Sequence, residues 1–177
     1  LWFTYDNDKH ICLILYLNNN NNIIKYEKIV SCFSDNLVNG KGTILYGVLF
    51  NVNNRQMTLQ NFAVINIHYL EGLNVYKIKY RDKVSLFKKL FENISQISFN
   101  KFNLLIGLPI ILDNYINSIN IISTLSYTIN CIKPINLNLF NLNLNFKVSN
   151  INNKYNKNVI FGVMADIEPD IYILTCD

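Results

Sequence analysis

The sequence predicts an α+β domain built mainly of antiparallel β-sheet with a few packed helices. In its first half, β-prone apolar runs alternate with short polar breaks, and one later segment changes to helical periodicity. No linker or internal repeat divides the chain, so we expect residues 1–177 to form a single domain. The chain begins with Leu1 rather than Met and stops at Asp177 directly after a strand-like run, which indicates a segment of a longer polypeptide.

The predicted sheet begins with a hairpin whose two strands flank an Asn-rich break at residues 18–22. A turn signal, Asn39-Gly40, separates this hairpin from a second pair of strong β-prone runs. Strands are predicted over 11–17, 23–33, 43–52 and 57–69. Their short polar connections favour an antiparallel meander.

The clearest helical pattern lies between Tyr80 and Gln96. Its apolar face is predicted to hold Val84, Phe87, Leu90, Phe91, Ile94 and Ile97, opposite Lys83, Lys88, Lys89 and Glu92. A second helix is predicted over 113–123 with Asp113 as its N-terminal cap. The apolar face of this second helix is predicted to hold Tyr115, Ile116, Ile119 and Ile122.

The last quarter of the chain alternates Asn with Leu or Phe over residues 136–150, which predicts a half-buried strand or hairpin. A polar loop follows, and two short strands are predicted over 159–164 and 171–176. These segments complete the expected mainly β architecture.

Composition narrows the function classes without identifying a partner. Half of the residues are hydrophobic, and the formal net charge of +4 permits nucleic-acid binding but does not diagnose it. The longest apolar run, residues 104–112, is much shorter than the roughly 20 residues that span a bilayer. We therefore expect no membrane span and an intracellular, reducing location.

Cysteines and histidines form no recognisable metal or catalytic pattern. The four cysteines, Cys12, Cys32, Cys131 and Cys176, are scattered and are interpreted as buried thiols. The nucleotide-binding, hydrolase, metalloprotease and kinase signatures are missing from the sequence. His68 interrupts an apolar strand, where it is either a polar-face residue or a base or ligand whose partners the sequence does not reveal. We assign no catalytic residue, metal or cofactor.

Two ordered segments carry a family resemblance. Residues 43–50 read TILYGVLF, residues 62–75 read FAVINIHYLEGLNV, and Tyr80-Arg81-Asp82 then opens the predicted helix. This succession resembles the covalent nucleotidyltransferases, the mRNA-capping guanylyltransferases and the DNA and RNA ligases. In that family a T-L-L-D-G-E strand precedes an F-x-x-x-D-x-x-x-x-x-G strand and a Y-x-x-R segment. The resemblance implies a nucleotidyltransferase-like fold.

The residues that carry the family's chemistry are replaced. Tyr46 and Val48 stand at the acidic positions of the first segment around Gly47, and Asn66 stands where the family has an aspartate. No K-x-D-G sequence occurs, and none of Lys9, Lys25, Lys28 and Lys41 is followed by Asp-Gly. A lysine nucleophile and metal-binding carboxylates are both needed for covalent nucleotidyl transfer. The sequence therefore favours a degenerate, noncatalytic member.

A second resemblance is to poorly characterised proteins of large cytoplasmic DNA viruses. Its specific matches are Gly42 to Gly47, Phe62 to Gly72 and residues 165–172. This resemblance implies a viral source, which the AT-rich composition suits, and a location in the host cytoplasm, a viral factory or the virion. Snurportin, which is similar to the capping enzymes in architecture, binds a trimethylguanosine cap without transferring nucleotide. Fold and activity can therefore separate.

Three functions follow from these resemblances. The first is noncatalytic binding of RNA, a 5′ cap or a nucleotide; the second is a virion or transcription-assembly module that holds viral proteins. The third, an active guanylyltransferase or ligase, needs an unrecognised lysine and metal site.

For the first function, stacking and phosphate contacts define the candidate ligand-binding residues. They are Lys41, Tyr46, Gly47, Arg55, Asn66, His68, Tyr69, Arg81 and Tyr172. The alternatives are that Tyr46 and Tyr69 pack on the core and that Arg81 caps or pairs at a helix start.

Overall fold

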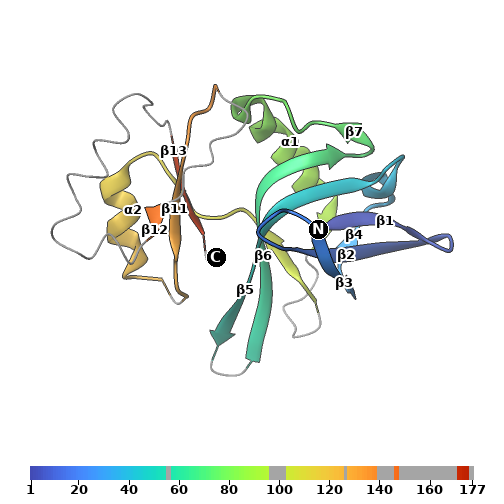
Figure 1. Cartoon of the computed structure of the whole chain (residues 1–177), viewed down its shortest axis with the longest axis horizontal. Helices are drawn as coiled ribbons and strands as arrows, with labels where there is room; N and C mark the ends of the chain where they lie inside the picture. The colour runs from blue at the N-terminus through green and yellow to red at the C-terminus, as the bar shows by residue number, and fades with distance from the viewer. Residues whose placement is uncertain (55–56, 96–102, 126, 139–145, 148–170, 176–177) are drawn as a thin grey trace.

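The computed structural model describes residues 1–54, 57–95, 103–125, 127–138, 146–147 and 171–175 (Figure 1). It has an α+β fold in which antiparallel pairing predominates. Two lobes are visible: a larger sheet with helix α1 holds most of the first half of the chain, and a smaller sheet with helix α2 holds the later segments.

The larger sheet has seven strands within the described residues, in the order β3-β2-β1-β5-β6-β7, with β9 also paired to β6. Its strands are β1 (Trp2–Asp6), β2 (Lys9–Leu17), β3 (Ile23–Ile29), β5 (Thr43–Asn54), β6 (Met57–Leu70), β7 (Leu73–Asn74) and β9 (Leu105–Gly107). All neighbours are antiparallel except β6 and β9. The predicted hairpins 11–17/23–33 and 43–52/57–69 are confirmed as β2–β3 and β5–β6, except that β3 ends at Ile29 and residues 32–33 form a separate strand that pairs elsewhere.

The β5–β6 hairpin contains two register shifts, both near the start of β5 and the end of β6. Leu45 pairs with Ile67 and the preceding β5 residue pairs with Tyr69, so His68 is an extra residue in β6. A second shift follows Tyr46, which lies directly opposite Asn66. Such bulges bend a strand and redirect side chains, and they often occur beside functional sites.

Gly47 is needed at the second bulge because β6 approaches its Cα closely. A Cβ at Gly47 would lie 2.1 Å from the Ala63 carbonyl oxygen and 2.8 Å from the Phe62 ring. No L side chain fits without movement of backbone. The glycine of the family-like motif is therefore used here for strand packing.

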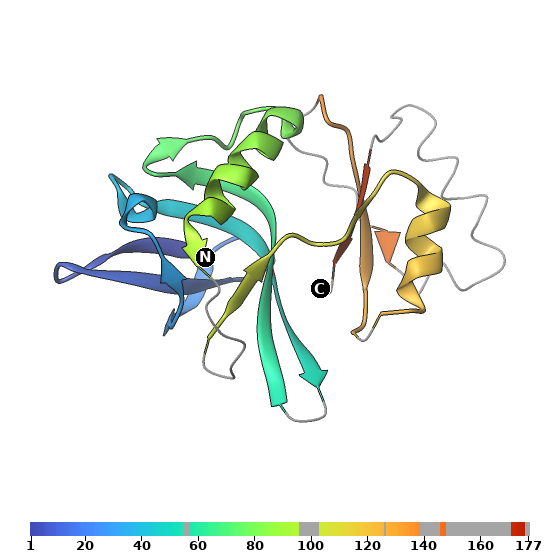
Figure 2. The same ribbon diagram turned by 180° about the vertical axis from the view of Figure 1, so that it is seen from behind.

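Helix α1 (Tyr80–Glu92) lies across one face of the larger sheet (Figure 2). Its buried residues are Tyr80, Lys83, Phe87 and Leu90. The prediction of a helix at this place is confirmed, and Phe87 and Leu90 are buried as predicted, but the places of Lys83 and Val84 were predicted wrongly. Lys83 is 0% exposed whereas Val84 is 55% exposed, because the lysine amine finds polar partners beneath the helix.

The smaller sheet has the strand order β10-β13-β11-β12 in the described chain. Its strands are β10 (Ile111–Leu112), β11 (Cys131–Ile135), β12 (Phe146–Lys147) and β13 (Ile171–Thr175). Ile132 and Leu174 form a second apolar cluster with Ile129, beside α2 (Tyr115–Ile122). Ile135 and Ile173 instead join the main core, which links the two lobes.

Three shorter elements lie beside the larger sheet and helix α1. They are β4 (Cys32–Phe33), the 3-10 helix η1 (Asp35–Val38) and β8 (Ile94–Ser95). β4 and β8 pair with each other, and η1 buries Leu37 and Val38 in the main core. These connections place α1 firmly against the larger sheet.

Several local predictions need correction. Helix α2 is capped by Asn114, whose side chain accepts hydrogen bonds from the Ile116 and Asn117 backbone, and not by Asp113. Ile116 is exposed rather than buried, because the buried side of α2 is the one that carries Ser118. Cys12 and Cys131 are buried as predicted, but Cys32 is exposed. Most of the predicted strand 136–150, all of 159–164 and Cys176 lie outside the described residues.

Candidate ligand-binding pocket

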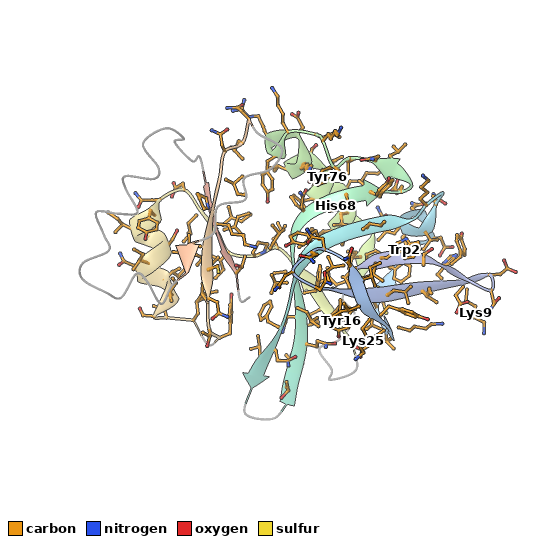
Figure 3. The ribbon with its side chains drawn as sticks, viewed as in Figure 1. Trp2, Lys9, Tyr16, Lys25, His68 and Tyr76 are labelled. Atoms are coloured by element: carbon orange, nitrogen blue, oxygen red, sulfur yellow. The ribbon has the colours of Figure 1, made fainter. Side chains whose placement is uncertain are left out.

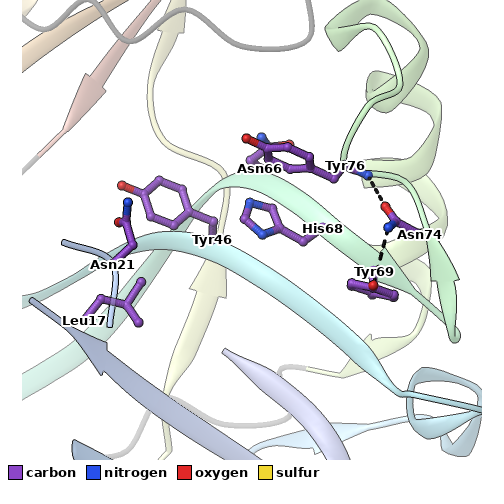
Figure 4. Close-up of a pocket in the computed structure, with 8 residues that line it drawn as sticks. All are labelled: Leu17, Asn21, Tyr46, Asn66, His68, Tyr69, Asn74 and Tyr76. Atoms are coloured by element: carbon purple, nitrogen blue, oxygen red, sulfur yellow. Dashed lines mark hydrogen bonds between the residues drawn. The ribbon is translucent and has the colours of Figure 1, made fainter. Parts of the chain in front are cut away.

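A pocket of about 540 Å³ opens where β5 and β6 meet the tip of the β2–β3 hairpin. Its size is in the range of small-molecule sites, roughly 300–1,000 Å³. The lining residues are Leu17, Asn21, Tyr46, Asn66, His68, Tyr69, Asn74 and Tyr76 (Figure 4). Four of them, Tyr46, Asn66, His68 and Tyr69, are candidate residues from the sequence.

Aromatic rings form one part of this pocket. The Tyr46 and His68 rings are nearly parallel, with 5.9 Å between centroids and an interplanar angle of 11°. The Tyr76 ring meets His68 edge-on at 4.7 Å. In Figure 4 the Tyr46 and His68 side chains project from neighbouring strands toward the same space. Tyr46 is 40% exposed, so part of this aromatic surface is open to a ligand.

Carboxamides form the polar part of the pocket. Asn66 is largely buried, and its Oδ1 accepts hydrogen bonds from the Ile67 backbone N–H at 2.9 Å and from Lys83 Nζ at 2.7 Å. The Asn74 Oδ1 accepts from the Tyr76 backbone N–H at 3.1 Å, and its amide nitrogen lies 3.4 Å from Tyr69 Oη. These contacts hold both amides in fixed orientations.

Lys83 lies beneath the pocket, on the first turns of α1. Its amine donates to Asn66 Oδ1 and to the Tyr76 carbonyl oxygen at 2.8 Å, and it lies 5.7 Å from the centroid of the Tyr76 ring. Burial lowers the pKa of Lys83 to about 8. The amine is therefore mostly protonated at pH 7 and adds a positive charge behind Asn66.

The electrostatics of Lys83 extend to His68. Burial, and then the nearby Lys83 charge, lower the pKa of His68 from its ordinary value of 6.5. His68 is therefore neutral at pH 7. A neutral imidazole beside Tyr46 can stack and can donate or accept a single hydrogen bond.

The remaining candidate residues lie apart from this pocket. Arg81 is exposed on the first turn of α1, where its backbone N–H donates to the Leu137 carbonyl. Lys41 is exposed in the turn before β5, where its carbonyl accepts from Trp2 Nε1. Tyr172 belongs to β13 in the smaller sheet, and Arg55 lies outside the described residues.

Sequence reasoning missed Leu17, Asn21, Asn74, Tyr76 and Lys83. Asn74 reaches the pocket because the Glu71-Gly72 turn, with φ of +49° and +83°, folds β7 back onto β6. Lys83 could have been found from the heptad spacing of Tyr80, Lys83, Phe87 and Leu90. A buried lysine also needs an acceptor, and Asn66 in an apolar strand offers one.

Figure 3 shows His68, on β6, beside Tyr76, in the turn between β7 and α1, and away from the polar surface cluster on the β2–β3 hairpin. In that cluster Tyr16 Oη donates to Glu27 at 2.9 Å, and Lys25 pairs with the same carboxylate.

Among the described residues, no group of three or more His, Cys, Asp or Glu side chains is arranged to hold a metal ion.

Comparisons with protein-family models, curated proteins and solved structures found no match. The resemblance to nucleotidyltransferases therefore rests on the sequence motifs. A search of the described helices for a membrane-spanning segment found none of sufficient length and apolarity.

Proposed function

We propose that this chain is a noncatalytic binding domain for a nucleobase-containing ligand, a nucleotide or the 5′ cap of an RNA, on a scaffold related to capping enzymes and ligases. The observation that carries the proposal is the joint placement of Tyr46, His68 and Asn66 in one pocket. Aromatic rings stack on any base, and fixed amides bond to base edges.

The contacts of the pocket support binding rather than covalent transfer. The eight lining residues include no carboxylate and no lysine. Lys83 Nζ donates to two protein oxygens at 2.7 and 2.8 Å, and while it is protonated it has no lone pair with which to attack a phosphate. The hydrogen-bond donors and aromatic rings of the pocket can hold a base without forming a covalent bond to it.

A titration of the purified chain with short fluorescent RNAs, with and without a methylated cap, tests the proposal at physiological salt. Nonspecific charge binding is weak there. Saturable binding that free cap analogue or mononucleotide competes away is the expected result, and the Tyr46→Ala variant is expected to lose it. The matched control is Tyr5→Ala, since Tyr5 is an exposed tyrosine that also packs on a histidine, His10.

Binding to neither RNA, nor to mononucleotides, contradicts the proposal. Equal binding by the wild type and by Tyr46→Ala places any RNA contact elsewhere. Incubation with radiolabelled GTP or ATP and a divalent cation is a further control, because a labelled protein band would show covalent transfer.

A second candidate function, a viral protein-interaction module, is favoured by strand β3. This strand ends the sheet order in the described chain, and it exposes Ile23, Ile24 and Tyr26 at 59%, 67% and 69%. Exposed apolar edge strands are suited to strand addition by a partner. Light scattering of the wild type and of Ile24→Lys tests self-association through this edge; a concentration-dependent mass in the wild type alone supports it.

A further inference from the structure

The buried contact between Lys83 and Asn66 determines which way the Asn66 amide faces. A lysine ammonium can only donate hydrogen bonds, so the amide atom 2.7 Å from Lys83 Nζ is the oxygen. The Ile67 backbone N–H donates to the same oxygen at 2.9 Å. Both donors agree on one orientation of the amide.

The Asn66 amide nitrogen is consequently the group left for the pocket. Within the described part of the chain, this nitrogen makes no hydrogen bond, and it is not among the buried polar atoms that lack a partner. Asn66 itself lines the pocket. An accessible N–H₂ group with no protein acceptor is available to a ligand acceptor.

Asn74, which also lines the pocket, repeats this arrangement. Its Oδ1 is occupied by the Tyr76 backbone N–H, and its nitrogen faces Tyr69 Oη at a long 3.4 Å. With the charge of Lys83 behind Asn66, the amides of Asn66 and Asn74 present N–H donors rather than oxygen acceptors to the pocket. Two such amides favour ligand oxygens over ligand amino groups.

We propose, on the basis of the proposed function, that this pocket selects bases with an exocyclic oxo group over bases with an exocyclic amino group, and that Lys83 is the positioning residue for this selectivity. Lys83 acts through Asn66 by holding Oδ1 away from the pocket. A ligand carbonyl oxygen accepts a hydrogen bond from the exposed N–H₂ of Asn66. A ligand amino group at the same place is itself a donor, so it cannot form this hydrogen bond.

Calorimetric titration with two pairs of mononucleotides tests this selectivity. Inosine and adenosine monophosphates differ in the exocyclic group at the six position, and uridine and cytidine monophosphates differ in the exocyclic group at the four position. We expect the oxo member of at least one pair to bind about tenfold more tightly, the effect of one neutral hydrogen bond.

Two variants test the mechanism. Asn66→Asp keeps an oxygen for Lys83 and turns its second oxygen to the pocket, so the preference is expected to reverse toward the amino member. Lys83→Met removes the donor that fixes the amide, so the preference is expected to fall to about twofold or less. Asn61→Asp is the matched control on the same strand. The Asn61 amide nitrogen donates a hydrogen bond to the Leu59 carbonyl oxygen, and Asn61 does not line the pocket.

The outcomes separate the two proposals. If none of the four nucleotides binds, the selectivity is wrong, and the proposed function is wrong as well only if the capped and uncapped RNAs also fail to bind. If they bind but the wild type prefers the amino members or shows no preference, the selectivity is wrong while the function stands. An oxo preference that survives in Lys83→Met overturns the role of Lys83. If Lys83→Met does not fold, the proposal is tested by the ratio of oxo to amino nucleotide affinity in the wild type and by the reversal of that ratio in Asn66→Asp.

Discussion

Two tyrosine–histidine pairs on the larger sheet differ in what lies behind them. Tyr5 and His10 meet edge-on at 4.9 Å on the β1–β2 hairpin, and His10 contacts Asp35, whose side chain is 81% exposed. Tyr46 and His68 stack above a buried lysine and an oriented amide. The first pair is a solvated surface contact, whereas the second pair belongs to a pocket.

The comparison teaches that aromatic residues alone do not define the candidate site. A chain with 11 tyrosines and 11 phenylalanines brings rings together in several places. The pocket is distinguished by a buried cation, by amides held in one orientation and by two bulges that place Tyr46 beside Asn66. Four predictions test whether these features separate the two regions.

The largest expected effect is on the bulge that shapes the pocket. Gly47→Ala places a methyl group 2.1 Å from the Ala63 carbonyl oxygen, and we expect it to lower the free energy of unfolding by about 3 kcal/mol. Urea denaturation measures the change. Gly107→Ala is the control, because its added methyl meets nothing within 4 Å. Similar stabilities for both variants would show that the strands do not approach as described.

The next effect is on ligand affinity. Tyr46→Ala removes one stacking face, and we expect a loss of about 2 kcal/mol, or roughly thirtyfold, in nucleotide affinity. Tyr5→Ala, in the surface pair, is expected to change the affinity less than about twofold. Calorimetry gives both values. Equal losses in the two variants would mean that the pairs do not differ in function.

A smaller effect concerns stability and pH. The folded pKa of Lys83 is about 8 and its ordinary value is 10.5, so the unfolded chain binds more protons between these values. The cost of burying the charge is present below pH 8 and is relieved as the pH rises toward 10.5. We therefore expect the stability of the wild type, measured against Lys83→Met, to increase from pH 7.5 to 9.5. A constant difference would contradict the lowered pKa of Lys83 in the folded chain.

The smallest effect is on the titration of His68. Since the Lys83 charge contributes to the lowered pKa of His68, Lys83→Met is expected to raise that pKa, while burial keeps it below 6.5. The imidazole resonances in an NMR pH titration measure the pKa of His68. The His10→Gln variant shows which of the imidazole resonances belong to His68. An unchanged His68 in Lys83→Met would remove the lysine from the electrostatics of the pocket.

The sequence predicted much of the fold because periodicity dominates it. Alternating apolar residues and short polar breaks located β2–β3 and β5–β6, and helical spacing located α1. The rotation of α1 was missed, since a hydrophobicity pattern places Val84 inside and Lys83 outside. The structure reverses them because Lys83 pairs with Asn66, a contact between positions 17 residues apart.

The candidate site was predictable where the two family-like segments, residues 43–50 and 62–75, contained its residues. Tyr46 and Asn66 were aligned with family positions on adjacent strands, and the structure makes them cross-strand neighbours. Asn74 and Tyr76 depend on the tight turn at Glu71-Gly72, whose positive φ values no apolar pattern encodes. Distant residues such as Lys41 and Arg81 carry suitable charge, but the fold places them elsewhere.

The most direct test of the pocket is to map where a nucleotide binds. Backbone and side-chain amide resonances of the labelled protein are recorded by NMR during titration with inosine monophosphate. The account predicts that the largest shift changes occur at Tyr46, Asn66, His68 and Asn74, including the Asn66 side-chain amide, with little change at Tyr5 and His10. Changes centred on β10, β11 and β13, or no saturable change at all, would contradict it.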